Sequence, residues 1–165
     1  HTGLNFCQSI RGLIYSRLGI YTQAIELYEE SLDIATSIGD RKAQADLLMS
    51  LGSTYMVLED YELAINLIER SLSISRELGD IQGEANTLGS LGDAYYNIQD
   101  YSEALEYYQQ SLLKSRLLQD VEKEIYTLGK LGSTYALLEQ SEEANLFQQL
   151  QISLIRYWIA RWEGV

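Results

Sequence analysis

The chain has 165 residues, with 24 acidic and 12 basic side chains, a net charge of −12, no proline and one cysteine. The length suits one domain, and the acidic balance argues against nucleic acid and anionic lipid as partners, because both require clustered lysine and arginine. A lone cysteine cannot form an internal disulfide, and no apolar run approaches the ~20 residues of a membrane span, so we expect a cytoplasmic protein without a membrane segment. The chain starts at His1 rather than Met, and we expect it to be a piece of a longer protein.

A period of 40 residues runs through the whole chain. Four kinds of residue keep it: Gly12, Gly52, Gly92 and Gly132; Tyr15, Tyr55, Tyr95 and Tyr135; Ala24, Ala64, Ala104 and Ala144; and Asp40, Asp80 and Asp120. Four classes of position that share one step predict a tandem array. We expect four units, over residues 1–40, 41–80, 81–120 and 121–165, within a single domain 1–165.

Each unit contains two helical patterns joined by short turns. Apolar residues recur at steps of three and four, as in Ala45, Leu48 and Leu51, while no alternating strand pattern competes. Along the chain, we expect turns near residues 19–21, 38–40, 58–60, 78–80, 98–100, 118–120 and 138–140, and therefore eight helices. Glycine can close a helix and the following aspartate can cap the next one. Gln119 stands where glycine is expected, which predicts a stiffer turn or two helices that run closer to continuous.

The C-terminal stretch departs from the period, because Ile159-Ala160 stands where Gly-Asp is expected. We expect the last helix to continue through Trp162 as an extended cap whose outer face is polar, as terminal repeats require. An alternative is that Trp158 and Trp162 form an end interface, either within a longer chain or in a homo-oligomer, since aromatic residues are enriched at interfaces.

The repeated residues resemble the tetratricopeptide repeat (TPR) signature, W-x2-L-G-x2-Y followed by A-x3-F. The second unit has Leu48, Leu51, Gly52 and Tyr55, then Ala64 and Ile68; the third has Leu88, Leu91, Gly92 and Tyr95, then Ala104 and Tyr108; the fourth has Leu128, Leu131, Gly132 and Tyr135, then Ala144 and Gln148; the first is degenerate. The resemblance implies an all-α, right-handed superhelical α-solenoid of four helix-turn-helix units. The 40-residue period is similar to that of kinesin light chains, Leu-Gly-Asn-rich polarity adaptors and bacterial signalling proteins of the family. Periodic glycines then mark close packing, and the periodic tyrosines are expected in the core.

The resemblance also implies a non-catalytic scaffold that binds an extended peptide or partner helix in a concave groove lined by the first helix of each unit. The stripe opposite the Leu-Gly-Tyr face, which varies between units, gives the candidate groove residues: Asp46, Met49, Ser53, Met56, Asn86, Gly89, Asp93, Tyr96, Asn97, Tyr126, Gly129 and Ser133. Gly89 and Gly129 would leave a recess flanked by Tyr96 and Tyr126, or would allow close packing of adjacent first helices. Asp46 and Asp93 favour a neutral or basic partner over an acidic one.

Catalytic chemistry has little support in the sequence. The only histidine is His1, Cys7 lies among apolar residues, and no cluster of Cys and His has metal-ligand spacing. A glycine-rich stretch around Lys130 lacks the Ser/Thr that follows lysine in a phosphate-binding loop. We therefore expect no enzyme, no cofactor and no metal. Two alternatives to the peptide-binding scaffold stay open: a self-assembly segment, and a regulatory sensor domain of a larger signalling protein or enzyme.

Overall fold

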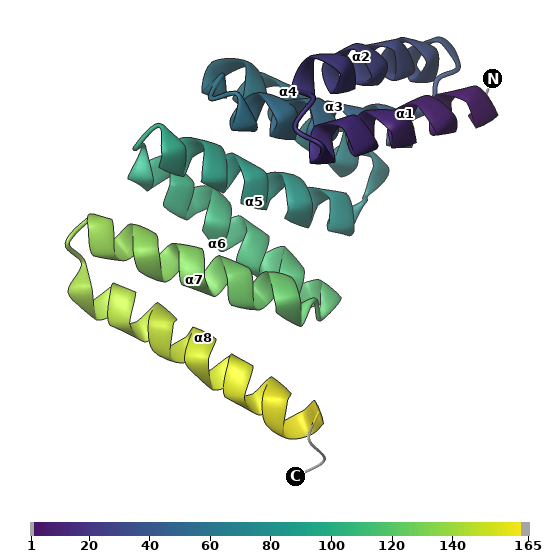
Figure 1. Cartoon of the computed structure of the whole chain (residues 1–165). Helices are drawn as coiled ribbons and strands as arrows, with labels where there is room; N and C mark the ends of the chain where they lie inside the picture. Colours follow the sequence, from purple (N-terminus) through teal and green to yellow (C-terminus); the bar gives the residue numbers. More distant parts are fainter. Residues whose placement is uncertain (1, 163–165) are drawn as a thin grey trace.

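The structure is a computed structural model that describes residues 2–162, with side chains described for residues 8–161. Every regular element in residues 2–162 is an α-helix, which confirms the expected fold class (Figure 1). The helices are α1 (Thr2–Arg17), α2 (Tyr21–Ser37), α3 (Arg41–Val57), α4 (Tyr61–Leu78), α5 (Ile81–Asn97), α6 (Tyr101–Leu118), α7 (Val121–Leu137) and α8 (Ser141–Trp162). None of these helices is both long and apolar enough to cross a membrane.

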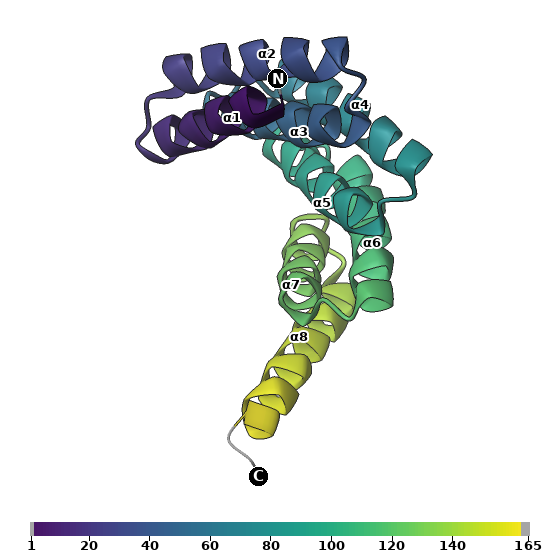
Figure 2. The same cartoon turned by 90° about the vertical axis from the view of Figure 1, so that its right-hand side faces the viewer.

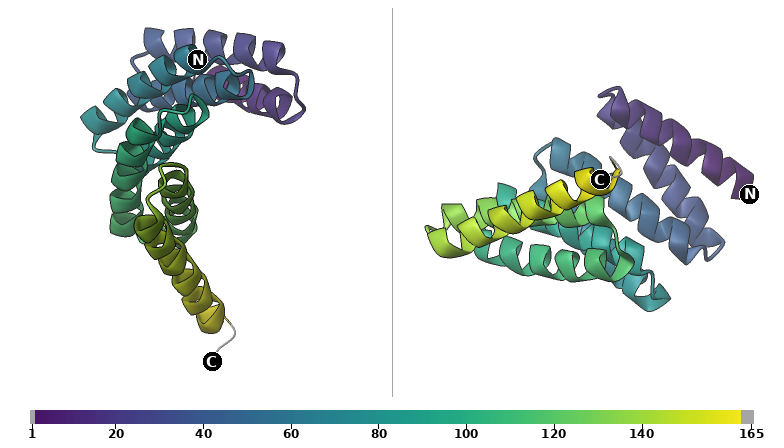
Figure 3. Two further views of the ribbon diagram at one scale, coloured as in Figure 1. Left: turned by 90° about the vertical axis from the view of Figure 1, so that its left-hand side faces the viewer. Right: turned by 90° about the horizontal axis from the view of Figure 1, so that it is seen from below.

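The helices form antiparallel pairs that stack in chain order. Each helix packs mainly on the helix before it and the helix after it, so the chain is an α-solenoid of helical repeats. The stack follows a curved path with the two termini at opposite ends, as Figures 2 and 3 show from three directions. The odd-numbered helices are the first helices of the pairs, and the first-helix stripe therefore runs along α3, α5 and α7.

Aspartate side chains cap five of the helices, two at Gly-Asp positions and three where glutamate or glutamine precedes the aspartate. The carboxylate of Asp40 accepts a hydrogen bond from the backbone N–H of Ala43 at 3.0 Å, and that of Asp80 accepts one from Gly83 at 2.9 Å. Asp60, Asp100 and Asp120 do the same for α4, α6 and α7. Such caps typically stabilise a helix by about 0.5–2 kcal/mol.

The helices on either side of Gln119 do not run closer to continuous, so that alternative is wrong. Gln119 adopts the left-handed conformation with φ 55°, close to the φ of 65° at Gly79. α6 ends at Leu118 just as α4 ends at Leu78, and Asp120 donates its backbone N–H to Ser115 at 2.9 Å, as Asp80 does to Ser75. The backbone hydrogen bonds and the cap at Asp120 impose the turn, so the side chain at 119 tolerates the strain.

The periodic glycines lie where the two helices of a pair touch. A Cβ atom added at Gly52 would lie 2.5 Å from Ile68, and one added at Gly92 would lie 2.5 Å from the ring of Tyr108. Leu48, Leu88 and Leu128 are buried beside these contacts. The four periodic tyrosines pack against the core clusters, as expected of core positions, but each is only half-buried. Their rings pack at the edge of the helix pairs, where Tyr95 stacks on Tyr107 with ring centroids 5.2 Å apart.

Candidate functional site

The residues of the predicted groove lie on α3, α5 and α7, but they are not equivalent. Met49 and Met56 on α3 pack against the apolar cluster of Ile68, Leu72, Leu88 and Leu91 between α4 and α5, so they mainly join the repeats. Ser53 and Asn97 are exposed and line neither of the two pockets described below. The residues that the structure does bring together belong to α5 and α7.

A pocket of about 400 Å³ lies between α5 and α7. Four of the predicted residues line it, namely Asn86, Gly89, Asp93 and Tyr126. Its other lining residues, which are not among the predicted groove residues, are Ser90, Ser111, Asp120, Glu122, Lys123 and Thr127. We call this space the α5–α7 pocket. A neighbouring pocket between α7 and α8 is lined by Tyr126, Gly129, Lys130, Ser133, Gln148, Gln151 and Ile152, so Tyr126 separates the two.

The carboxylate of Asp93 is the centre of a hydrogen-bonded cluster at the edge of the α5–α7 pocket. One oxygen of Asp93 accepts the hydroxyl of Tyr108 at 2.8 Å and the ammonium of Lys130 at 2.8 Å. The other oxygen accepts the hydroxyl of Tyr126 at 2.6 Å. The Lys130 ammonium also lies 5.2 Å from the ring centroid of Tyr96 and 5.4 Å from that of Tyr126, within cation–π range. We call these five residues the Asp93 cluster.

Both tyrosines that donate to Asp93 hold their protons firmly. Burial raises the pKa of Tyr108, and the charge of Asp93 raises it further. Burial also raises the pKa of Tyr126, with its hydrogen bond to Asp93 acting in the same direction. The neutral form of each tyrosine is favoured here, because its hydroxyl donates to the carboxylate of Asp93 whereas an ionised phenolate would repel it. The two hydroxyls and Lys130 therefore hold Asp93 in place.

Sequence reasoning missed Lys130 and Tyr108 as parts of this cluster. The repeat signature marks Tyr108 only as a repeat position, and Lys130 stands in a glycine-rich stretch that does not match a phosphate-binding loop. The 40-residue period did contain a signal. Asp93 stands where the neighbouring units have Ser53 and Ser133, while Lys130 stands where they have Ser50 and Ser90. Opposite charges that replace serine at two facing positions are typical of a contact between adjacent units.

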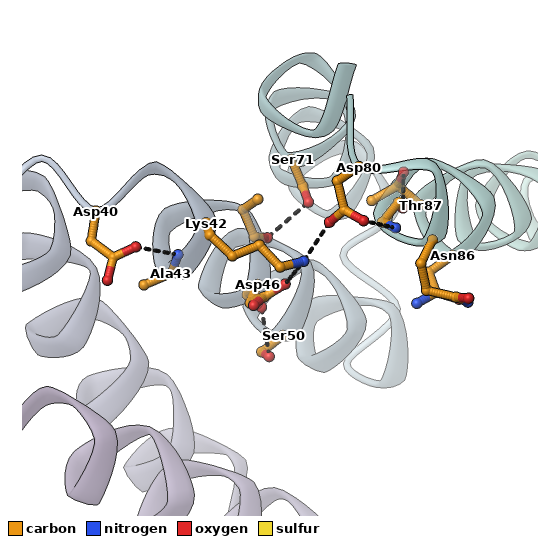
Figure 4. A network of polar contacts seen from close by, with 12 residues as sticks. Asp40, Lys42, Ala43, Asp46, Ser50, Ser71, Asp80, Asn86 and Thr87 are labelled. Atoms are coloured by element: carbon orange, nitrogen blue, oxygen red, sulfur yellow. Dashed lines mark hydrogen bonds and ion pairs between the residues drawn. The ribbon is translucent and has the colours of Figure 1, made fainter. Parts of the chain in front are cut away.

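Asp46 is also ion-paired, in a second network at the junction of α3 and α5. Figure 4 shows Lys42 reaching both Asp46, at 3.1 Å, and Asp80, which caps α5. The bond from Lys42 lowers the pKa of Asp80. Burial lowers the pKa of Lys42, but the hydrogen bonds and charges of Asp80 and Asp46 outweigh it and leave that pKa raised. Neither of the two predicted groove aspartates therefore presents an unpaired carboxylate.

Both stripe glycines face the second helix of their own pair, but only Gly129 is required by close packing there. A Cβ atom at Gly129 would clash with the side-chain amide of Gln151, which donates to the carbonyl of Ile125 at 3.0 Å. A Cβ atom at Gly89 would lie 3.4 Å from the hydroxyl of Ser111. The contacts are thus with the second helix of the same pair, not with adjacent first helices as the packing alternative expected. Gly89 alone also lines the α5–α7 pocket.

Three polar groups of the α5–α7 pocket have hydrogen-bonding capacity to spare. Lys123 is half-buried, and in the described part of the chain its ammonium forms neither a hydrogen bond nor an ion pair. Burial lowers the pKa of Lys123, against the opposing charges of Asp120, Asp93 and Glu122. The hydroxyl of Ser90 has no partner among the described residues, and the amide of Asn86 only accepts from Gln82 at 3.4 Å.

The remaining predicted residues lie outside this geometry. Trp158 is half-buried on α8, and the side chain of Trp162 lies outside the described residues. His1 and the side chain of Cys7 are likewise outside them. No group of three or more His, Cys, Asp or Glu in the described part could hold a metal ion.

Two family models described as tetratricopeptide repeat match the sequence, over residues 12–42 and 43–112. Together they cover more than half of the chain. The chain belongs to the tetratricopeptide repeat family. Proteins of this family are generally non-catalytic interaction modules, and the fold suggests a protein-interaction scaffold. No curated protein matches the chain.

Several solved structures share the fold at low sequence identity. BtubC (BKLC) from P. vanneervenii is similar with a TM-score of 0.88 and 21% identity over 94% of this chain and 64% of that one. Aspartyl phosphate phosphatase F from Bacillus subtilis has a TM-score of 0.88 and 11% identity over 98% of this chain and 41% of that one. A signal transduction ATPase with a tetratricopeptide repeat sensor from Pyrococcus horikoshii has a TM-score of 0.77 and 20% identity over 82% of this chain and 21% of that one. The chain therefore spans less than two thirds of each.

Proposed function

We propose that this TPR protein is a scaffold that holds an extended, uncharged peptide segment against the first-helix stripe, anchored in the α5–α7 pocket. The proposal rests on two features of the pocket. Gly89 contributes backbone without a side chain to the lining, and the donor groups of Asn86, Ser90 and Lys123 have no acceptor among the described residues. A peptide main chain can approach closely where a side chain is missing. Its carbonyl groups can then accept hydrogen bonds that the pocket leaves open.

The charges around the pocket favour a neutral segment over a charged one. A basic segment would meet the ammonium of Lys123, while Asp93 is already ion-paired to Lys130 and Asp120 already caps α7. An acidic segment would meet Asp93, Asp120 and Glu122 around the single spare ammonium of Lys123. Main-chain carbonyls and the amides of Asn or Gln avoid both penalties, because they accept hydrogen bonds without carrying charge. The ring of Tyr126 adds an apolar wall for the aliphatic part of such a side chain.

The experiment is a selection of phage-displayed random peptides on the whole chain, followed by fluorescence anisotropy with the selected peptides. We expect sequences enriched in Asn and Gln over Asp, Glu, Lys and Arg. The variant Asn86→Ala/Ser90→Ala removes two donors and should weaken binding at least tenfold. The matched control is Asn66→Ala/Ser73→Ala, which removes the same groups from exposed positions on α4 and should change nothing.

Two results would contradict the proposal. Peptides that bind with equal affinity to the wild type and to the Asn86→Ala/Ser90→Ala variant would place the site elsewhere. Equal weakening by the control pair would show that the loss is not specific to the pocket. Helical circular dichroism of each variant separates these results from loss of the fold.

A further inference from the structure

The outer face of α8 carries an apolar stripe that no other part of the described chain covers. Leu146, Leu150 and Tyr157 are exposed by 53%, 40% and 61%. Together with the exposed Ser153, they follow steps of four, three and four residues. This spacing puts all four on one helix face and is the spacing of a coiled-coil seam. We call these four residues the α8 stripe.

The repeat itself does not require an apolar stripe here. The residues at the same positions of the period are all polar on the first two second helices: Glu26, Glu30, Asp33 and Ser37 on α2, and Asn66, Arg70, Ser73 and Glu77 on α4. On α6 two of the four are apolar, since Leu113 and Leu117 follow Glu106 and Gln110 there, and both leucines are exposed. The outer face is thus polar on α2 and α4, half apolar on α6 and mostly apolar on α8.

The α8 stripe is also not the face that a following repeat would cover. Leu72 on α4 and Leu112 on α6 are only 5% and 6% exposed because they pack against leucines of α5 and α7. The equivalent residue on α8 is Ile152, which lines the pocket with α7 and is not part of the α8 stripe. A further first helix stacked in the same way would bury Ile152 and leave Leu146 and Tyr157 in water.

The charges at the two ends of α8 indicate that the partner of the α8 stripe is a second, antiparallel copy of the same helix. Glu142 precedes it and Arg161 follows it, each one step along the same face. The guanidinium of Arg161 reaches the hydroxyl of Tyr157 at 3.4 Å, so Arg161 extends along the stripe. When two copies of α8 lie antiparallel across a two-fold axis, Leu150 faces Ser153 of the other copy, Leu146 faces Tyr157, and Glu142 faces Arg161. The α8 stripe is therefore self-complementary in an antiparallel pair, both in the order of its side chains and in charge.

We propose that a second copy of this chain docks on the α8 stripe, which makes an antiparallel, isologous α8–α8 dimer. In an isologous interface the two-fold axis repeats each contact, so every pairing described above occurs twice. Helix α8 has 22 residues, which corresponds to a length of about 33 Å. One helix pair of this length buries less than the ~800 Å² per partner of a standard stable interface. The dimer is therefore weak, and its population rises with protein concentration. This inference does not depend on the α5–α7 pocket.

Sedimentation velocity over a concentration series from about 1 µM to about 1 mM tests the dimer. We expect one species that shifts from monomer to dimer mass and no larger assembly. Leu146→Glu should weaken association at least tenfold, because it buries a carboxylate twice, once in each half of the interface. The matched control is Leu113→Glu on α6, where the exposed leucine has no role in the contact and association should be unchanged.

The orientation has its own test in a charge exchange. Glu142→Arg alone and Arg161→Glu alone should each weaken association about two- to tenfold, because each places like charges opposite one another in both halves. The double variant Glu142→Arg/Arg161→Glu should restore it. A chain that stays monomeric at every concentration, a dimer that Leu146→Glu leaves intact, or a double variant weaker than both singles would overturn the proposal.

Discussion

The hydroxyl of Tyr126 on α7 donates a 2.6 Å hydrogen bond to the carboxylate of Asp93 on α5. This bond joins the first helices of two successive pairs, across the pocket that separates them. A charged residue that looks like a groove-facing anchor in the sequence thus connects two repeats. Substitutions at Asp93 should therefore act on stability before they act on binding.

Replacement of Asp93 by Asn should lower the free energy of unfolding by about 1–3 kcal/mol, because three donors lose a charged acceptor. Asp46→Asn is the matched control, since Asp46 is an exposed partner of Lys42, and it should change stability by about 0.5 kcal/mol or less. Urea denaturation followed by circular dichroism measures both. Equal effects of the two variants would show that the Asp93 cluster contributes nothing beyond a surface ion pair.

Alkaline pH should destabilise the protein through Tyr108 and Tyr126. Both have folded pKa values above the ordinary 10.0. The stabilisation is therefore complete below pH 10 and is lost as the pH rises above 10, because the unfolded tyrosines release protons first. The melting temperature should fall in that window for the wild type and fall less for Tyr108→Phe/Tyr126→Phe. A double variant with the same pH dependence as the wild type would rule out these two tyrosines as the cause.

Alanine should have opposite effects at two glycines of α5. At Gly92 the new Cβ would lie 2.5 Å from the ring of Tyr108, so Gly92→Ala should destabilise by about 1–3 kcal/mol. At Gly89 the nearest atom is 3.4 Å away, so Gly89→Ala should stabilise by about 0.5–1 kcal/mol through helix propensity. Chemical denaturation of the two variants compares them directly. If both substitutions changed the free energy of unfolding in the same direction, the packing of α5 on α6 would not explain the difference between the two glycines.

Glycine should be better than the native residue at position 119. Gln119 has a φ of 55°, where a residue with a Cβ atom is strained by about 1–2 kcal/mol, so Gln119→Gly should raise the melting temperature. The reverse change at the equivalent turn, Gly79→Gln, should lower it, since φ is the only obstacle there: a Cβ at Gly79 would meet nothing within 4 Å. An increase on both substitutions, or a decrease on both, would contradict the equivalence of these turns.

The site could be predicted only in part. The variable stripe predicts that Asn86, Asp93 and Tyr126 share a face, because their places in the period fix the side of the helix on which they lie, and the structure brings the three together at the α5–α7 pocket. It did not predict that Asp93 would be paired, since its partners Tyr108 and Lys130 come from two other helices. Helix periodicity gives the direction of a side chain, but the distance between two facing helices depends on packing that one helix does not encode.

The sequence by itself determined the eight helices, their order and their aspartate caps, because a 40-residue period of glycine, alanine and aspartate specifies local structure and nearest-neighbour stacking. Only the tertiary structure decided which charges are free. Asp93 pairs with Lys130 across a unit boundary, whereas the ammonium of Lys123 and the α8 stripe have no partner in the described chain. The physical reason is that pairing and burial depend on contacts between units. In a solenoid the periodic residues form the stacking contacts. Residues that break the period come into contact with one another only after the helices have stacked.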